Sequence, residues 1–308
     1  MPKTKPDQSL INSMFLQIVE SDQNASVSLD LLGEEYDFSN ARRYMEIEIS
    51  GKPVIAIDPL NIYLHAVYHN QQQSLHFLIQ AGSDHTATST YGKGEKPIAL
   101  QNSRSLRTSL VMNGGNDICW AVLSDHGDAL SNLAKTYANN NLEMDVNQRQ
   151  TVPYSNLNLP DIEARKHTAL DIAVIQYVAL RILDNEHAEQ TRAIGEQLSQ
   201  AIAPLLDQFK EAGISGDIAI MPGNMQDLEP IAQITENNIF LLLEKGAIGS
   251  EEAYFPMSLD RKAAPFFSDD GFEKMSLNDF CFYNKGMFSQ ELLTRLTGYT
   301  PEPAFNQK

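Results

Sequence analysis

The chain has 308 residues, of which 42% are apolar and 20% charged, and this composition predicts a folded protein rather than a disordered one. The chain has 40 acidic and 23 basic residues, which gives a formal net charge of −17. Because nucleic-acid binding depends on lysine and arginine that neutralise phosphates, this charge disfavours nucleic acids and anionic membrane surfaces as partners.

Two features come first along the chain. Residues 12–32 carry apolar side chains at helical spacing in two runs, which predicts a pair of helices. Residues 45–57 alternate between apolar and polar side chains around Ser50-Gly51-Lys52, which predicts a β-hairpin.

Three segments then share one pattern, in which a helix with a small central alanine is followed by a polar turn and a second apolar helix. The segments begin at Asn61, Asn116 and Thr168, and their alanines are Ala66, Ala121 and Ala173. A small residue lets two helices approach closely, and apolar residues three and four apart give each helix one buried stripe. A single pair cannot bury this stripe alone, so neighbouring pairs are expected to stack.

These segments resemble the ankyrin repeat, whose first helix opens Thr-Pro-Leu-His-x-Ala and whose second ends Leu-Leu-x-x-Gly-Ala. In the first segment, Ala66, the second-helix positions Leu75, Leu78 and Ile79, and the final Gly82 match this pattern. The second segment matches at Ala121, Leu130, Leu133 and Ala134 but carries Tyr137 in the place of the glycine, so an altered turn is expected there.

The later part of the chain fits the repeat less regularly. Long helices are predicted at Thr168–Asp184 and Glu186–Ala212, and further helix pairs at Pro230–Ala247 and Asn278–Gly298. The alanine anchors lie 55 and 52 residues apart, whereas ankyrin repeats recur about every 33 residues. The excess falls in the loops.

The resemblance implies an all-α fold, an ankyrin-like solenoid of helix pairs with long irregular or β-hairpin finger loops. Residues 1–250 would form the solenoid and residues 251–308 the capping helices and a tail. Ankyrin-like domains bind other proteins, so the resemblance implies protein–protein recognition through the concave face and the loops. Ankyrin-like repeats with long insertions also resemble secreted effectors of intracellular bacteria. The partner of such an effector would be a host protein.

Candidate partner-binding residues fall in two long loops and two turns. The loop at 90–116 holds a local basic excess in an acidic chain, which suits an acidic surface on a partner. The connector at 141–167 is a second candidate finger, and the turns between paired helices are polar and carry no periodic apolar residues. The candidates are Tyr91, Lys93, Lys96, Arg104 and Arg107 in the first loop, Arg149 and Tyr154 in the second, and Asn70, Gln71, Asp125 and His126 in the turns.

An enzyme, a hydrolase or transferase hidden in the insertions or the C-terminal segment, is the main alternative. Cys119 and His126 lie two helical turns apart, about 10 Å, too far for a nucleophile and its base, and Cys281 would need a distant partner such as His167 or His187. His65 and His69 share a helical face, but zinc needs further ligands. The acidic residues of the C-terminal segment that could hold a metal are Asp260, Asp269, Asp270 and Glu273.

A structural subunit of a larger assembly is a third reading, and it predicts a large flat apolar patch. No cofactor and no metal are expected. Two cysteines, no apolar signal segment and no apolar run of about 20 residues indicate a protein of a reducing, intracellular compartment without membrane insertion. As an effector it would act in the host cytoplasm.

Overall fold

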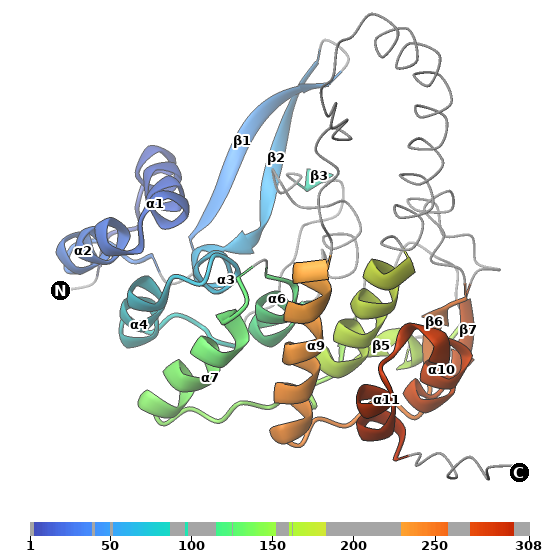
Figure 1. Ribbon diagram of the computed structural model, residues 1–308. Coiled ribbons are helices and arrows are strands. Elements are labelled where there is room, and N and C mark those ends of the chain that lie inside the picture. Colours follow the sequence, from blue (N-terminus) through green and yellow to red (C-terminus); the bar gives the residue numbers. More distant parts are fainter. Residues whose placement is uncertain are drawn as a thin grey trace, which may run out of the picture.

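The computed structural model describes residues 3–38, 41–49, 52–86, 96–97, 115–124, 126–151, 160–161, 163–182, 229–257 and 272–298. Most of these residues are helical (Figure 1). The α-helices are α1 (Gln8–Glu20), α2 (Asp22–Gly33), α3 (Ile62–Tyr68), α4 (Gln72–Gln80), α6 (Asp117–Leu123), α7 (Ala129–Asn139), a helix at 169–182, α9 (Glu229–Glu244), α10 (Leu277–Tyr283) and α11 (Gln290–Thr297). The strands are β1 (Arg42–Ile49), β2 (Lys52–Asn61), β3 (Lys96–Pro97), β4 (Gln150–Thr151), β5 (Lys166–His167), β6 (Ala253–Pro256) and β7 (Phe272–Met275), and two short 3-10 helices are η2 (Glu163–Arg165) and η4 (Lys285–Met287).

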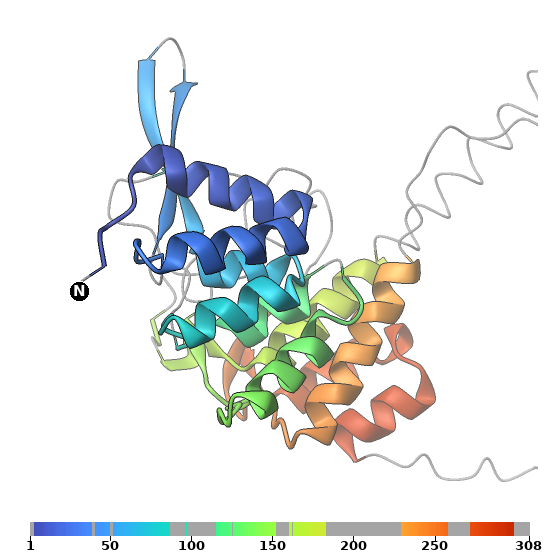
Figure 2. The ribbon, with the colours of Figure 1, turned by 90° about the vertical axis from the view of Figure 1, so that its left-hand side faces the viewer.

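Consecutive helices pack together in pairs: α1 with α2, α3 with α4, α6 with α7, and α10 with α11. The pairs also contact one another, since α1 packs on α3 and α3 on α6, while α2 packs on α4 and α4 on α7. Figure 2 shows the pairs following one another from α1 and α2 at one end toward α9 and α11. Among the described residues, no helix combines the length and apolar content needed to cross a bilayer.

Four first helices begin in the same way, with a side-chain oxygen that accepts a hydrogen bond from the backbone N–H three residues later. These caps are Asn61, Asn116, Thr168 and Ser276. Five residues after each cap lies a small side chain that is 0% exposed: Ala66, Ala121, Ala173 and Cys281. The predicted alanine anchors are therefore buried where helices meet, and the register from cap to anchor recurs along the chain.

Three second helices also end in the same way. Gly82 after α4, Asn141 after α7 and Gly246 after α9 have positive φ values of 87°, 54° and 82°. In each case the next residue donates its N–H to a carbonyl five residues earlier: Ser83 to Leu78, Leu142 to Tyr137, and Ala247 to Leu242. This left-handed ending closes the last turn of a helix and redirects the chain.

The end of α7 corrects the expectation for Tyr137. The left-handed position falls on Asn141, four residues later, while Tyr137 stays inside α7 and is buried. The turn between α6 and α7 and helix α7 itself are each two residues longer than their counterparts in α3 and α4. Asparagine tolerates positive φ better than other residues with a Cβ, so the turn survives without glycine.

The helix pair predicted at Pro230–Ala247 is wrong, because one helix, α9 (Glu229–Glu244), spans most of this segment. Within α9, Asn238 is buried and donates a side-chain hydrogen bond to the Val122 carbonyl of α6 at 3.3 Å. A polar residue inside a helix is stable when a neighbouring helix satisfies it. The predicted helix at 186–212 lies outside the described residues.

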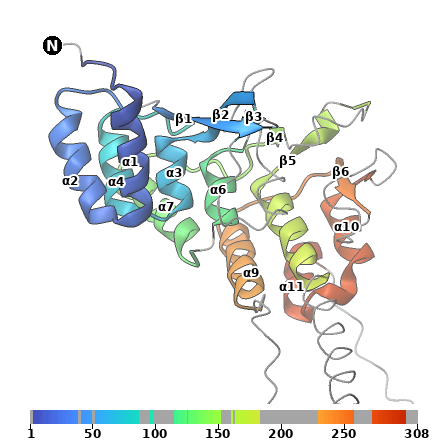
Figure 3. The ribbon, with the colours of Figure 1, turned by 90° about the horizontal axis from the view of Figure 1, so that it is seen from above.

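Strand pairs lie along one edge of the helices (Figure 3). The predicted hairpin is confirmed and longer than expected, with β1 and β2 antiparallel and β3 joined parallel to β2. The pairs β4–β5 and β6–β7 were not expected as strands, and we call these two pairs ribbon 2 and ribbon 3. Strands β2, β5 and β7 each end within two residues of a helix start, at α3, the helix at 169–182 and α10.

A buried carboxylate joins α3, α6 and α7. Asp117 Oδ2 accepts hydrogen bonds from the hydroxyls of Tyr63 at 2.7 Å and Tyr137 at 2.5 Å, and Asp117 Oδ1 accepts from the N–H of Ile118. Burial raises the pKa of Asp117, and the hydrogen bonds of the two tyrosines oppose this shift. The carboxylate therefore links two neighbouring helix pairs inside the core.

Gly249 lies between α9 and β6 and packs against Leu277, the first residue of α10. A Cβ at this position would lie 2.6 Å from the Cβ of Leu277. We therefore expect Gly249→Ala to lower the free energy of unfolding by about 1–3 kcal/mol, as overpacking does. Urea titration measures this loss. Gly33→Ala is the matched control, because nothing lies within 4 Å there and alanine favours the helix; an equal loss in both variants would contradict the prediction.

Candidate functional site

The turns between paired helices hold neighbouring pairs together. The side chain of Asn70 donates to Asp128 at 2.6 Å and accepts from Asn132, and the side chain of Gln71 donates to the Ile18 carbonyl at 2.5 Å. Asn70 also has a positive φ of 55°. These two residues were expected to have no role in folding, but the structure gives both a structural role. Their contact with a partner stays a prediction.

Further hydrogen bonds join the neighbouring turns on either side, and we call the whole set the ladder of turn contacts. Asp22 of α2 accepts hydrogen bonds from the N–H groups of Gln73 and Ser74 at the start of α4. Ser124, after α6, donates to the carbonyl of Tyr68 in α3 at 2.6 Å. His126 is exposed beside this ladder. Successive turns are thus tied to one another, which fixes the spacing of the pairs.

Several predicted site residues cannot be placed. Tyr91, Lys93, Arg104, Arg107, Asp125 and Tyr154 lie outside the described residues. Lys96 belongs to β3, where its Cα pairs with that of Ala56 in β2. The basic loop therefore stays a prediction, and Arg149 is the predicted finger residue whose contacts are known.

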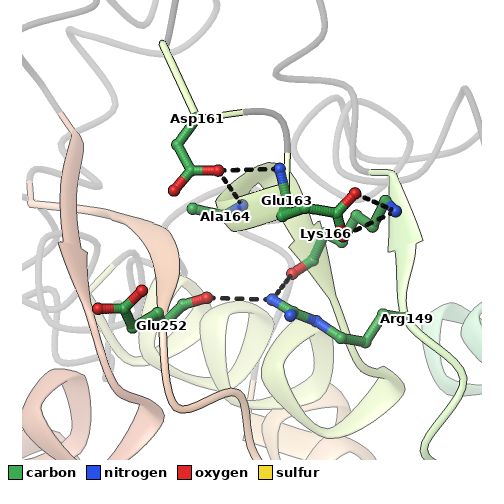
Figure 4. Close-up of polar contacts among 6 residues, drawn as sticks. All are labelled: Arg149, Asp161, Glu163, Ala164, Lys166 and Glu252. Atoms are coloured by element: carbon green, nitrogen blue, oxygen red, sulfur yellow. Dashed lines mark hydrogen bonds and ion pairs between the residues drawn. The ribbon is translucent and has the colours of Figure 1, made fainter.

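Arg149 bridges ribbons 2 and 3 (Figure 4). Its Nη2 donates to the carbonyl of Lys166 in β5 at 2.7 Å and to the carbonyl of Glu252, just before β6, at 3.0 Å. A guanidinium can serve two acceptors at once because its donors are fixed in one plane. Arg149, which the sequence predicted to contact a partner, therefore holds the two ribbons together.

Ion pairs add to this bridge. Lys274 of β7 lies 2.9 Å from Asp161 and 2.8 Å from Glu252, and Lys166 lies 2.7 Å from Glu163. Hydrogen bonds to Glu252 and Asp161 raise the pKa of Lys274, and the hydrogen bond from Lys274 lowers the pKa of Asp161. Asp161 also accepts from the N–H groups of Glu163 and Ala164, which orders η2 (Figure 4).

Between the ribbons lies an open recess of about 550 Å³, which we call the ribbon recess. It is lined by Asn147, Arg149, Asp161, Glu163, Ala164, Thr168 and residues 248–252. The side chains of Glu163 and Glu252 are 72% and 71% exposed, and Glu251 is exposed without an ion pair among the described residues. The rim therefore presents carboxylates to solvent beside one guanidinium.

The floor of the ribbon recess is polar and internally satisfied. Ser250 donates its hydroxyl to Asp171 Oδ2 at 2.5 Å and its N–H to Asp171 Oδ1 at 3.0 Å, and Thr168 N–H donates to Asp171 Oδ2 at 2.8 Å. All three residues are buried. Because these groups already have partners, the floor supports the rim. On the rim, Glu163 and Glu252 are paired with Lys166 and Lys274, and Glu251 is the exposed carboxylate that has no ion pair among the described residues.

The groups considered for catalysis are placed unfavourably for it. Burial raises the pKa of the thiols of Cys119 and Cys281 to about 12, which disfavours the reactive thiolate. His167 is buried with its ring nitrogens at 3.0 Å from the Tyr254 carbonyl and 3.3 Å from the Arg165 carbonyl. The carboxylate of Asp171, which lies near His167, accepts a hydrogen bond from the hydroxyl of Ser250.

The metal candidates are likewise separated. Asp260, Asp269 and Asp270 lie outside the described residues, and Glu273 is exposed in β7. His65 is buried and His69 is half-buried, and their rings meet edge to face with centroids 4.5 Å apart. No group of three histidine, cysteine or acidic side chains suited to a metal occurs within the described part of the chain.

The sequence did not predict the ribbon recess. Its two ribbons come from strands of two and four residues, too short for an alternating pattern to appear. The sequence did contain two acidic clusters, Asp161 with Glu163 and Glu251 with Glu252, but only the fold brings these clusters together. No family model, curated protein or solved structure matches this chain.

Proposed function

We propose that this chain is a stack of ankyrin-like helix pairs that recognises another protein at its ribbon edge. The observation that carries the proposal is the repeated register, in which a capped first helix places a small buried residue five positions later. Second helices with left-handed endings complete the unit. Such a unit repeats only where each pair buries the face of the next, as in repeat proteins that bind partners along extended surfaces.

The ladder of turn contacts supports a rigid platform for binding. Side chains of Asn70, Gln71 and Ser124 and the carboxylate of Asp22 join each turn to the next. A rigid surface loses little conformational entropy on binding, so more of the contact energy appears as affinity.

The chemistry of the ribbon recess suits a protein segment. Small-molecule pockets are mostly apolar with a few polar groups, whereas this rim carries Glu163, Glu251, Glu252 and Arg149 in the open. Exposed charges of this kind select a partner by electrostatic complementarity. We infer that the partner contributes lysine or arginine side chains to the acidic rim.

Selection from a displayed random-peptide library tests this proposal. Peptides are selected on the wild-type chain after depletion on the double variant Glu163→Lys/Glu251→Lys. We expect peptides rich in lysine and arginine that bind the double variant at least about tenfold more weakly, a loss of about 1.4 kcal/mol. Glu143→Lys/Glu244→Lys is the matched control, because it makes the same charge change at exposed carboxylates outside the recess.

Two results would overturn recognition at the recess. One is that no peptide survives depletion, and the other is that selected peptides bind the recess variant and the control variant equally. Action in a host cell after secretion from a bacterium rests on the ankyrin resemblance alone and stays a prediction.

A further inference from the structure

The first helix pair exposes an apolar stripe. Leu16 and Val19 of α1 and Val27 and Leu31 of α2 are 55%, 46%, 53% and 70% exposed. The described part of the chain has seven large exposed apolar side chains, and these are four of them. We call this surface the α1–α2 stripe.

The position of the stripe in the fold is unusual for a terminal pair. The inner side of the pair is covered, since α2 packs on α4 and α1 packs on α3. The end of a stack of helix pairs is ordinarily polar, because nothing follows to bury it. Figure 2 shows α1 and α2 as the end of the row. An apolar face here has the character of a surface that another helix covers.

The charge around the stripe indicates what kind of helix fits. Residues 8–35 contain no lysine or arginine, but they contain Glu20, Asp22, Asp30, Glu34 and Glu35. Helical spacing places Glu20 one turn beyond Leu16, and it places Asp30 and Glu34, which are four residues apart, on one side of Leu31. Asp30 and Glu34 have no ion pair among the described residues.

A groove beside the stripe also combines apolar and acidic side chains. It has a volume of about 390 Å³ and lies where α2 and α4 end, with Leu29 and Phe77 among its apolar lining. Its charged lining consists of three carboxylates and one cation: Asp30, Glu34, Asp37 and Lys3. The C-terminal ends of both helices add partial negative charge, which favours a cation. The groove therefore suits an apolar side chain that has a lysine or arginine next to it.

We propose that the α1–α2 stripe binds an amphipathic helix of a partner protein, whose apolar stripe is flanked by lysine and arginine. The partner's apolar side chains cover Leu16, Val19, Val27 and Leu31, and its basic side chains reach Glu20, Asp30 and Glu34. A second copy of this chain is a poorer occupant, because two faces of equal negative charge would repel each other.

Two synthetic helical peptides test the proposal by fluorescence anisotropy at physiological salt. They share one leucine stripe, flanked by lysine in the first and by glutamate in the second, and a scrambled lysine peptide controls for net charge. We expect the first peptide to bind at least about tenfold more tightly than the other two. Val27→Gln/Leu31→Gln should remove this preference, whereas Ile248→Gln, at another exposed apolar position, should keep it.

Other outcomes would overturn the proposal. Equal binding of the ordered and scrambled lysine peptides would mean charge attraction without a docking surface. A wild-type dimer in sedimentation, absent in Val27→Gln/Leu31→Gln, would assign the stripe to a second copy instead. Glu163→Lys/Glu251→Lys should bind the peptide like the wild type, so failure at the ribbon recess and failure here can be told apart.

Discussion

Replacing Asp117 with alanine is expected to lower the free energy of unfolding by about 3–5 kcal/mol. The substitution leaves the hydroxyls of Tyr63 and Tyr137 without their acceptor in the core, and each buried unsatisfied group costs about 1–3 kcal/mol. It also removes the contact through which α6 holds α3 and α7. Urea or thermal unfolding followed by circular dichroism measures the loss.

Matched variants separate this effect from a general loss of stability. Tyr137→Phe removes one donor and leaves no orphan group, so we expect a loss of only about 1 kcal/mol. Glu143→Ala changes an exposed carboxylate and should change stability by less than about 0.5 kcal/mol. If Asp117→Ala unfolds with the same free energy as Tyr137→Phe, the carboxylate does not hold the two helix pairs together.

Acid is expected to destabilise the contact between α1 and α3 through His65, which is buried, and His69, which is half-buried. Burial lowers the pKa of His69 to about 4 and the pKa of His65 well below its usual value. Both ring nitrogens of His65 have no hydrogen-bond partner, and its ring lies 4.9 Å from that of Phe15 in α1. The unfolded chain binds protons near pH 6.5, so stability is complete above that pH and falls as pH decreases toward 4.

The size of the expected loss of stability follows from the pKa shift of His69. Between pH 7 and 4.5 the His69 shift alone corresponds to about 2–3 kcal/mol, at about 1.4 kcal/mol per pKa unit. Carboxylates contribute over the same range, so the decisive quantity is the difference between variants. His69→Gln should lose about 2–3 kcal/mol less than the wild type over this pH range, while exposed His76→Gln should behave as the wild type. Equal pH dependence in all three proteins would contradict the prediction.

The helices were predictable because each buries a stripe of apolar residues. The pairs at α1–α2, α3–α4, α6–α7 and α10–α11 lie where residue spacing placed them, and Ala66, Ala121 and Ala173 are buried as expected. The N-terminal hairpin was also visible, because ten-residue β2 is long enough for alternation to appear.

Errors arose where a distant contact decided the local structure. The pair expected at Pro230–Ala247 is a single helix, α9, and a carbonyl of α6 satisfies the polar Asn238 inside it. Tyr137 occupied the place of the repeat's glycine, yet the turn before α7 and helix α7 itself are each two residues longer than in the first pair, so the left-handed position falls on Asn141. In both cases a residue's own preference was weaker than the contact that the fold offered it.

The candidate surfaces were the least predictable part. Arg149 was selected from the sequence, but its role as a bridge depends on two carbonyls 17 and 103 residues away. The exposure of Leu16 and Val27 was hidden for a similar reason, since both were read as parts of apolar helix faces. Periodicity shows which side chains share a face but not whether another helix lies against that face.

The strand pairs explain how the spacing between units can vary so widely. In β6–β7 the hydrogen bonds between Ala253–Pro256 and Phe272–Met275 bring together the two ends of the segment between them, and β7 leads at once into α10. Once the ends of a segment are fixed in this way, doubling its length costs only about 0.6 kcal/mol of loop-closure entropy. Evolution can therefore lengthen, shorten or replace such segments at little cost in stability while the helix core stays unchanged.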